Sequence, residues 1–373
     1  MTAPDDGETR SLAPKPGILD IAPYIGGEHS VPGVNRVFRL ASNENTAGPS
    51  PKARAAYIAT AGEIHRYPDG SSERLRTAIG KAHGLDPARI VCGAGSDELI
   101  QLLTKAYAGV GDEVLYSQYG FLLYPIAAKS VGATPVAAPE AGLRTDVDAV
   151  LARVTERTRI VFIANPNNPT GSYLPQDEMR RLHAGLPRDV LLVLDAAYAE
   201  YVEEADYDCG VELVDAADNV VMSRTFSKIY ALAGLRLGWL YGSPGIVDVI
   251  HRIRGPFNVG LAAQEAGVAA IADEAFVTAS RAAATRWRGW LTDALRALGL
   301  TVHPSVANFV LVRFPAEPGR DAAAALAFLK TRGILVRGVG GYGLPDCVRV
   351  TVGGEEECRV VAAALGDFVA HRG

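Results

Sequence analysis

Along the middle of the chain, short apolar runs alternate with longer amphipathic stretches, and turns rich in Gly, Asn and Pro separate them. The apolar runs have the length and composition of buried strands. These predicted strands are ARIVCGAG (88–95), DEVLYS (112–117), ATPVAA (133–138), RIVFIANP (159–166), DVLLVLD (189–195) and NVVMSRTF (219–226). Between them, SDELIQLLTKAYAG (96–109) and PQDEMRRLHAGL (175–186) have helical periodicity. Buried strands that alternate with helices predict an α/β fold with a mainly parallel sheet, covered by helices on both faces.

The two ends of the chain differ from this middle. Residues 1–39 are rich in Pro and Gly and predict an N-terminal arm. Near the C-terminus a long helical pattern (274–299) precedes short strand patterns, NFVLVRF (308–314), GILVRGV (333–339) and CVRVTV (347–352). We therefore expect a large domain over 40–260 and a smaller α+β domain over 261–373.

Composition excludes several classes of protein. The chain has 373 residues, of which 48% are hydrophobic and 21% charged, with a net charge of −5, which is ordinary for a globular protein of about two domains. No basic run could neutralise a nucleic acid backbone, and no apolar stretch is long enough to cross a bilayer. The first residues are polar and acidic, unlike a signal peptide. The four cysteines are far apart and no histidines are paired, so no metal site is expected. A soluble cytoplasmic protein without a nucleic acid or membrane partner fits best.

The segment SRTFSKIYALAGLRLG (223–238) follows a predicted strand and carries the most informative chemistry. Thr225 and Ser227 precede Lys228, and Arg236 follows eight positions later. Hydroxyls and a guanidinium bind a phosphate dianion, while a lysine amine condenses with an aldehyde. Crowding by Arg236 and by the cationic ring of such a cofactor should make that amine ionise less readily. A surface lysine at a helix start is the alternative for an isolated Ser-Lys pair.

Two other strand ends carry polar side chains. Asp195 ends an apolar run, where a buried carboxylate needs a cationic partner. The pyridinium nitrogen of pyridoxal 5'-phosphate (PLP) is such a partner, and Tyr198 could reach the ring hydroxyl from the same side. Asn168, in the turn NPNNPTG (165–171), offers an amide donor to the ring oxygen. A helix-capping aspartate and a plain turn are the alternatives for these two segments.

The run RIVCGAGSDELIQLL predicts a strand, a glycine turn and a helix. Ser96 would cap the helix, Asp97 suits its dipole, and the N–H groups there would bind a phosphate. A dinucleotide site is rejected because Glu98 stands where the third glycine of that motif should be. Tyr119, after the next strand, is a candidate to stack on the cofactor ring, with a core aromatic as the alternative.

With these residues assembled, the chain resembles fold-type I PLP enzymes of the aspartate aminotransferase superfamily, and among them the histidinol-phosphate aminotransferases. The resemblance runs from about Pro23 to near the C-terminus. Its most specific strings are LASNEN (40–45), HRYPDG (65–70), NPNNPTG (165–171), TFSKIYALAGLRLG (225–238), SVANFVLVRF (305–314) and RGVGGYGLPDCVRVTVG (337–353).

The resemblance implies a role for each matching residue. Lys228 would carry PLP as a Schiff base, Asp195 would face the pyridine nitrogen, and Asn168 and Tyr198 the ring oxygen. Tyr119 would stack on the ring. The residues implied around the phosphate are Ser96, Asp97, Thr225, Ser227 and Arg236. Tyr67 would reach the phosphate of a neighbouring subunit, which implies a homodimer with shared active sites.

The resemblance also implies how substrate is bound. Arg349 matches the arginine that holds a substrate carboxylate, and Arg337 with Tyr24 would help to hold the phosphate of histidinol phosphate. Thr46-Ala47 and Gln118 depart from the family pattern near the pocket, which affects substrate choice more than cofactor binding.

The implied reaction is a transamination in which histidinol phosphate donates its amino group to 2-oxoglutarate, giving imidazole acetol phosphate and glutamate in histidine biosynthesis. The alternatives are an aromatic amino-acid (Phe/Tyr) or dual-specificity aminotransferase, and a PLP decarboxylase of a phosphorylated amino acid. A non-enzymatic PLP-binding regulator is the alternative from another class. It would need a DNA-binding module, and about 40 residues without a basic patch precede LASNEN.

Overall fold

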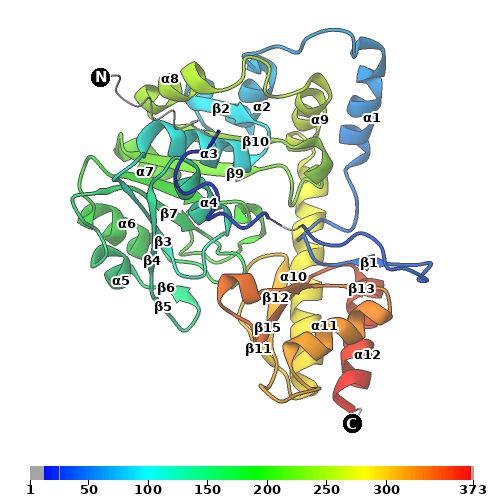
Figure 1. The fold of residues 1–373 in the computed structure, drawn as a ribbon. Coiled ribbons are helices and arrows are strands. Elements are labelled where there is room, and N and C mark those ends of the chain that lie inside the picture. The colour runs from blue at the N-terminus through cyan, green and yellow to red at the C-terminus, as the bar shows by residue number, and fades with distance from the viewer. Residues whose placement is uncertain (1–11, 25, 371–373) are drawn as a thin grey trace, which may run out of the picture.

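The computed structural model describes residues 12–24 and 26–370. The first eleven residues of the predicted arm lie outside the described part. Figure 1 shows a larger body built on one wide sheet and a smaller body beside it, with the long helix α10 (Glu274–Ala297) passing from one to the other.

The larger body contains a seven-stranded sheet. In spatial order its strands are β2 (Ile90–Gly93), β10 (Gly238–Gly242), β9 (Val220–Thr225), β8 (Leu191–Asp195), β7 (Thr158–Ala164), β3 (Glu113–Ser117) and β4 (Thr134–Ala138). All neighbouring pairs are parallel except those of β10, which is antiparallel to both β2 and β9. The predicted mainly parallel sheet is confirmed. Strand β10 was not predicted, because its run GWLYG follows the lysine segment directly.

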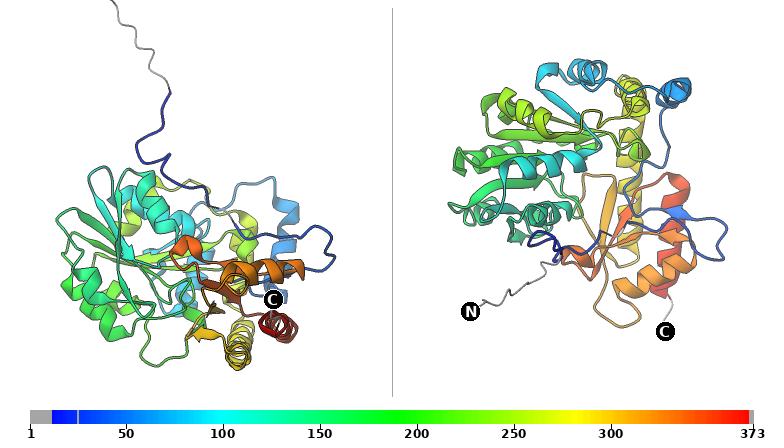
Figure 2. Two further views of the ribbon diagram at one scale, coloured as in Figure 1. Left: turned by 60° about the horizontal axis from the view of Figure 1, so that its bottom comes forward. Right: turned by 45° about the horizontal axis from the view of Figure 1, so that its top comes forward.

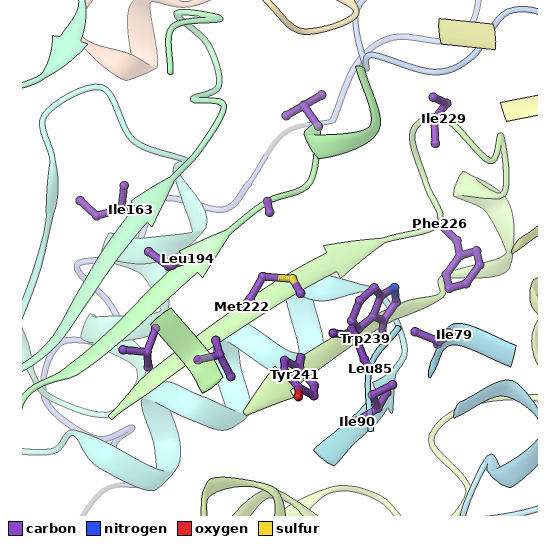
Figure 3. Packing of buried hydrophobic residues seen from close by; sticks show 14 of the residues in the cluster. Ile79, Leu85, Ile90, Ile163, Leu194, Met222, Phe226, Ile229, Trp239 and Tyr241 are labelled. Atoms are coloured by element: carbon purple, nitrogen blue, oxygen red, sulfur yellow. The ribbon is translucent and has the colours of Figure 1, made fainter. Parts of the chain in front are cut away.

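Residues along each central strand alternate between two apolar clusters. In β8, Leu192 and Leu194 pack on one face of the sheet, and Leu191 and Val193 pack on the other. Cross-strand neighbours extend each face, as in the row of side chains listed here from β7 to β2: Ile163, Leu194, Met222, Tyr241 and Ile90. Figure 3 shows this row with Trp239 beside it. Because both faces are apolar, both must be covered by helices.

Helices cover the two faces as predicted (Figure 1, Figure 2). One face carries α3 (Ser96–Tyr107), α4 (Leu123–Ser130) and α8 (Pro244–Ile253). The other carries α2 (Glu73–His83), α5 (Val147–Leu151), α6 (Gln176–Gly185), α7 (Val211–Ala216) and α9 (Leu261–Ile271), and α1 (Pro51–Ala59) packs against α9. A short hairpin, β5 (Glu140–Ala141) with β6 (Arg144–Thr145), stands apart from the sheet.

The smaller body has its own core. Its sheet has the order β11 (Thr301–His303), β12 (Phe309–Arg313), β15 (Cys347–Thr351) and β14 (Arg337–Gly338), packed against α11 (Ala322–Thr331) and α12 (Glu355–Ala370). Strand β1 (Phe38–Arg39), at the end of the predicted arm, pairs with β13 (Ile334–Leu335). Leu40, the predicted start of the large domain, packs in this second core. The domain boundaries themselves stay a prediction.

The sheet register brings several chain segments to one edge. Gly93 of β2 pairs with Gly238, which pairs with Thr225 at the end of β9. Asp195 at the end of β8 pairs with Ala164 at the end of β7. In a parallel sheet the chain leaves these strands on the same side, where clefts form and ligands bind.

Candidate active site

A cavity of about 250 Å³ opens at this edge, between the large sheet and the smaller body. Every residue predicted for the site lines it except Tyr67 and Tyr119. The predicted residues on its wall are Tyr24, Ser96, Asp97, Asn168, Asp195, Tyr198, Thr225, Ser227, Lys228, Arg236, Arg337 and Arg349. They come from the N-terminal arm, five strand ends or turns, and the small sheet, and the fold gathers them around one space.

The turn between β2 and α3 forms one end of the cavity. Gly95, with φ of +86°, is the N-cap of α3, and Ser96 is the first helical residue rather than the predicted cap. A Cβ on Gly95 would lie 2.6 Å from Nη2 of Arg236, so glycine lets the guanidinium approach the helix. Arg236 donates to Asp97 (3.0 Å) and to Ser227 Oγ (3.3 Å). Helix N–H groups, hydroxyls and a guanidinium meet here, which is the donor set for a phosphate dianion.

Asp195 is buried on the cavity wall, only 5% exposed. Its Oδ2 accepts a hydrogen bond of 2.9 Å from the Tyr124 hydroxyl, and its Oδ1 faces Ser223 Oγ at 3.4 Å. Burial raises the pKa of Asp195 to about 6, and the hydrogen bond from Tyr124 opposes that rise. Within the described residues this carboxylate has no ion pair, so a cationic ring nitrogen in the cavity would supply the partner that burial demands.

Tyr198 presents a fixed hydroxyl to the cavity. Its oxygen accepts a hydrogen bond of 2.8 Å from Nδ2 of Asn43, and its ring packs edge-on against Phe309. Asn43 has φ of +57° and is held by its backbone N–H, which donates to Thr351 Oγ1. Asparagine tolerates this left-handed conformation better than most residues. Asn43 belongs to the string LASNEN, but no role was assigned to it from the sequence.

Lys228 reaches the cavity from the loop after β9. Its Nζ donates to the backbone oxygen of Ser42 at 3.1 Å and lies 5.7 Å from the centre of the Tyr198 ring. Burial, followed by the positive charge of Arg349, lowers the pKa of Lys228 from 10.5 to about 8. The direction agrees with the expectation, but the main cause differs, because Arg236 contributes less to the lowered pKa than burial and Arg349.

Two arginines from the small sheet face the cavity side by side. Arg337 and Arg349 are direct partners in the register of β14 and β15. Arg349 is buried and donates to the backbone oxygen of Ala41 (2.6 Å) and to Oδ1 of Asn168, while its Nε has no hydrogen-bond partner among the described residues. Arg337 lies 5.7 Å from the centre of the Tyr24 ring. Two adjacent guanidiniums have the charge and donors to hold a doubly charged anion.

Tyr119 and Tyr67 lie outside the cavity wall. Tyr119 packs in an apolar cluster with residues of the small body, and its backbone oxygen accepts from Asn167 Nδ2, while Phe121 lines the cavity. Tyr67 is 82% exposed and stacks on Phe257 with the ring centres 4.5 Å apart. The stacking role of Tyr119 and the role of Tyr67 in a neighbouring subunit stay predictions.

Sequence reasoning missed several residues of the cavity. They are Ser42 and Asn43 after β1, Phe121 before α4, and Tyr342 near the end of the chain. It also missed Tyr124, whose contact with Asp195 spans 71 positions of sequence. LASNEN and the run RGVGGYG were signals for three of these. For Phe121 and Tyr124, in QYGFLLYP, the aromatic composition alone could not separate a site residue from a core residue.

Two kinds of feature are absent from the described part of the chain. Over residues 12–24 and 26–370, no group of three or more His, Cys, Asp or Glu side chains could hold a metal ion. No helix in the same residues is both long and apolar enough to cross a membrane.

Known proteins match the chain over nearly its full length. Residues 35–365 match the protein family described as aminotransferase class I and II. A relative from Rhodospirillum centenum named histidinol-phosphate aminotransferase is 64% identical over 356 residues, 95% of this chain and 98% of the relative. A relative of the same name from Paramagnetospirillum magneticum is 58% identical over 369 residues, 99% of each chain.

Solved structures agree with these matches. The histidinol-phosphate aminotransferase of Sinorhizobium meliloti, solved in complex with pyridoxal-5'-phosphate, superposes with a TM-score of 0.87 at 29% identity, covering 94% of this chain and 96% of that one. An aspartate aminotransferase of Thermus thermophilus, at 22% identity, shares the fold with a TM-score of 0.79, covering 90% of this chain and 97% of that one. The predicted fold-type I architecture is confirmed.

Proposed function

The chain belongs to the class I and II aminotransferases, and we propose that it transfers the amino group of histidinol phosphate to 2-oxoglutarate with PLP as its cofactor. The observation that carries the choice of donor is the pair Arg337 and Arg349, held in register on the cavity wall. A phosphate ester carries about two negative charges and is matched by two guanidiniums. Both relatives described above carry the name of this activity.

The residues present fit PLP. At the turn before α3, a Cβ on Gly95 would fill the space that Arg236 occupies, so the chain leaves a cradle of donors for the phosphate. Asp195 is buried without a cation beside it and matches the ring nitrogen. Tyr198 and Asn168 would face the ring oxygen, and Lys228 would hold the aldehyde. When bound, PLP supplies an aldehyde that condenses with amines and a protonated ring that accepts the electron pair released at the substrate Cα.

The chain's own groups then have distinct tasks. Lys228 would hold the aldehyde while no substrate is present, and its freed neutral amine would take the proton from the substrate Cα as general base. A pKa of about 8 leaves a useful fraction of that amine neutral near pH 7. Asp195 would keep the ring nitrogen protonated. Burial leaves the charge of the Asp195 carboxylate without a partner, and a proton on the ring nitrogen supplies the compensating positive charge. Arg349 and Arg337 orient the anionic end of the donor and of the acceptor.

We further propose that the active enzyme is a homodimer and that it works in the cytoplasm, where amino acids are synthesised. Tyr67 supports the dimer, since its ring is exposed and lies outside its own cavity. Other large apolar side chains are exposed in the same stretch, including Ile58 and Ile64, with Phe257 stacked on Tyr67. Several large apolar side chains exposed in one short segment are typical of an interface.

The relatives do not favour the aromatic aminotransferase, the PLP decarboxylase or the non-enzymatic regulator. The half-reaction separates them directly. Holoenzyme mixed with histidinol phosphate should lose its aldehyde absorbance as the amine form of the cofactor appears. Phenylalanine, tyrosine and aspartate, mixed separately, should convert it more slowly. Conversion by phenylalanine with no change on adding histidinol phosphate would show that the donor is wrong.

Arg337→Ala tests the anion site. It should weaken histidinol phosphate binding by about tenfold or more, since a charge-assisted hydrogen bond contributes about 1.5–3 kcal/mol. Phenylalanine conversion should change by much less, because that donor has no phosphate. Arg332→Ala is the matched control, as Arg332 stacks on Phe328 at the surface. Equal losses for both donors would remove the proposed role of Arg337.

A further inference from the structure

Tyr124 lies in the first turn of α4 and is fully buried beneath the cavity. Its ring stacks on Phe162 of β7, with centres 4.7 Å apart and planes 5° apart. Phe121 meets it edge-on at 6.0 Å, and Tyr116 is tilted against it at 6.4 Å. Rings on several sides therefore fix the direction in which its hydroxyl points, and that direction is toward Asp195 Oδ2, 2.9 Å away.

The hydroxyl of Tyr124 is a donor at any working pH. Burial and the adjacent carboxylate of Asp195 raise the pKa of Tyr124 well above its ordinary value of 10. The phenol thus keeps its proton, and a neutral phenol beside a carboxylate donates its hydrogen bond to it. Among the side chains near Asp195, Tyr124 gives the shorter contact, because Ser223 Oγ lies 3.4 Å from the other carboxylate oxygen.

The remaining groups around Asp195 do not take over this task. From α3, the carboxylate of Asp97 disfavours ionisation of Asp195. From β9, Ser223 donates weakly, and the backbone N–H of Ala197 donates from the segment after β8. Tyr198, in that same segment, directs its hydroxyl to Asn43. Asp195 therefore depends on Tyr124 for the strongest contact that favours its charged form.

We infer that Tyr124 is a positioning residue, whose hydroxyl holds the Asp195 carboxylate ionised and turned toward the ring nitrogen of the cofactor. This inference rests on the proposed function, because it assumes that PLP occupies the cavity. Tyr124 does not touch the cofactor itself. It acts through Asp195, by making the carboxylate ready before the cofactor enters.

The test is the affinity of the full-length, cofactor-free protein for PLP, measured by absorbance titration between pH 5.5 and 8.5. Tyr124→Phe keeps the ring and deletes the donor. Loss of a hydrogen bond to the charged form should raise the pKa of Asp195 by about one unit or more. The acid limb of the affinity profile, where affinity falls as Asp195 is protonated, should therefore move up by about one pH unit. With the Asp195 pKa moving from about 6 to about 7, affinity should fall about threefold at pH 6.5 and hardly at all at pH 8.5.

Tyr116→Phe is the matched control. Tyr116 is a tyrosine of β3 beside Tyr124, and it makes no hydrogen bond to Asp195. Its variant should keep the wild-type profile. The cofactor phosphate and Lys228 also titrate in this range, but they do so alike in all three proteins, so differences between profiles report on Asp195. In an Asp195→Asn background, Tyr124→Phe should cause no shift, because the amide does not titrate.

The possible outcomes lead to different conclusions about Tyr124 and about the proposed function. A uniform loss of affinity at every pH, without movement of the acid limb, would show that Tyr124 serves packing alone and would overturn the inference. An unchanged profile would overturn it as well. If the wild-type protein does not bind PLP, the proposed function itself is wrong. Should Tyr124→Phe fail to fold, Phe162→Leu, which removes the stacking ring but keeps the hydroxyl, must shift the acid limb in the same direction, and no shift would overturn the inference.

Discussion

Burial disfavours the charged form of both central ionisable residues of the cavity. It disfavours the ammonium of Lys228 and the carboxylate of Asp195, so the pKa of the first falls to about 8 and that of the second rises to about 6. The same burial makes a nucleophilic amine available and creates the need for a cation next to Asp195. Neither property belongs to the residue type alone.

Covalent binding of PLP to cofactor-free protein should accelerate as pH rises through about 8. The neutral amine of Lys228 is the nucleophile, and its fraction grows across its pKa of about 8. Replacing Arg349 with Leu removes a positive charge that lowers this pKa, so the profile should move to higher pH. Stopped-flow absorbance between pH 6.5 and 9.5 measures both. A wild-type rate that still rises steeply at pH 9.5, as it would for a lysine with the ordinary pKa of 10.5, would contradict the assignment.

A buried ion pair lies beside the strand ends that carry the cavity residues. Arg224 and Glu200, 6% and 5% exposed, pair at 2.7 Å next to Thr225 and the segment that carries Tyr198. Arg224→Met leaves the Glu200 carboxylate buried without its partner and should lower the free energy of unfolding by about 3–5 kcal/mol. Urea unfolding measures this loss.

Two further variants serve as controls for this prediction. Adding Glu200→Leu to Arg224→Met should restore much of the stability, because the double change buries no charge. Asp248→Asn breaks the exposed pair with Arg252 and should cost less than about 1 kcal/mol. If Arg224→Met lowers the free energy of unfolding as little as Asp248→Asn does, the Glu200 carboxylate does not need its buried partner, and the expectation is wrong.

At the scale of elements, strand β10 sets how closely the phosphate turn approaches β9. Gly238 pairs with Gly93 on one side and with Thr225 on the other. A Cβ at Gly238 would lie 2.4 Å from the backbone nitrogen of Ser96 and 3.0 Å from the backbone oxygen of Arg224. Backbone atoms cannot rotate away as side chains can, so this strand needs glycine to bring the two segments together.

Gly238→Ala should therefore lower stability by about 1–3 kcal/mol and weaken PLP binding, since the start of α3 must move. Gly289→Ala is the matched comparison. Gly289 is exposed in the interior of α10 with no atom near its missing Cβ, so alanine should raise stability by about 0.4–1 kcal/mol. Thermal unfolding and PLP titration report the two effects. Equal stability of the two variants would refute the close-approach argument.

At the scale of the whole molecule, the apolar side chains of Ile58, Ile64 and Tyr67 are exposed, and the proposed dimer would bury them. The full chain should sediment at about twice its mass of 39.4 kDa. Ile58→Glu combined with Ile64→Glu should shift it to the monomer, because charges are costly to bury. Val110→Glu, at an apolar position elsewhere that is 84% exposed, should not. A wild-type monomer would remove the role of Tyr67 in a neighbouring site.

The sequence by itself determined the parts that local chemistry carries. Buried strands could be recognised because apolar runs such as DVLLVLD must be covered on both faces. Asp195 stood out because a charge at the end of such a run needs a partner, and Lys228 because hydroxyls and an arginine accompany it. Strand ends of one parallel sheet lie together whatever the details of packing. That is why most of the predicted residues line the cavity.

Only the tertiary structure decided which distant segments meet. The antiparallel insertion of β10 and the pairing of Arg337 with Arg349 follow from sheet register. The contact of Tyr124 with Asp195 depends on how α4 packs on β7. Local periodicity shows which side of an element is apolar, but not which element it will face. The charge state of Asp195, and with it the readiness of the site, is a property of that packing.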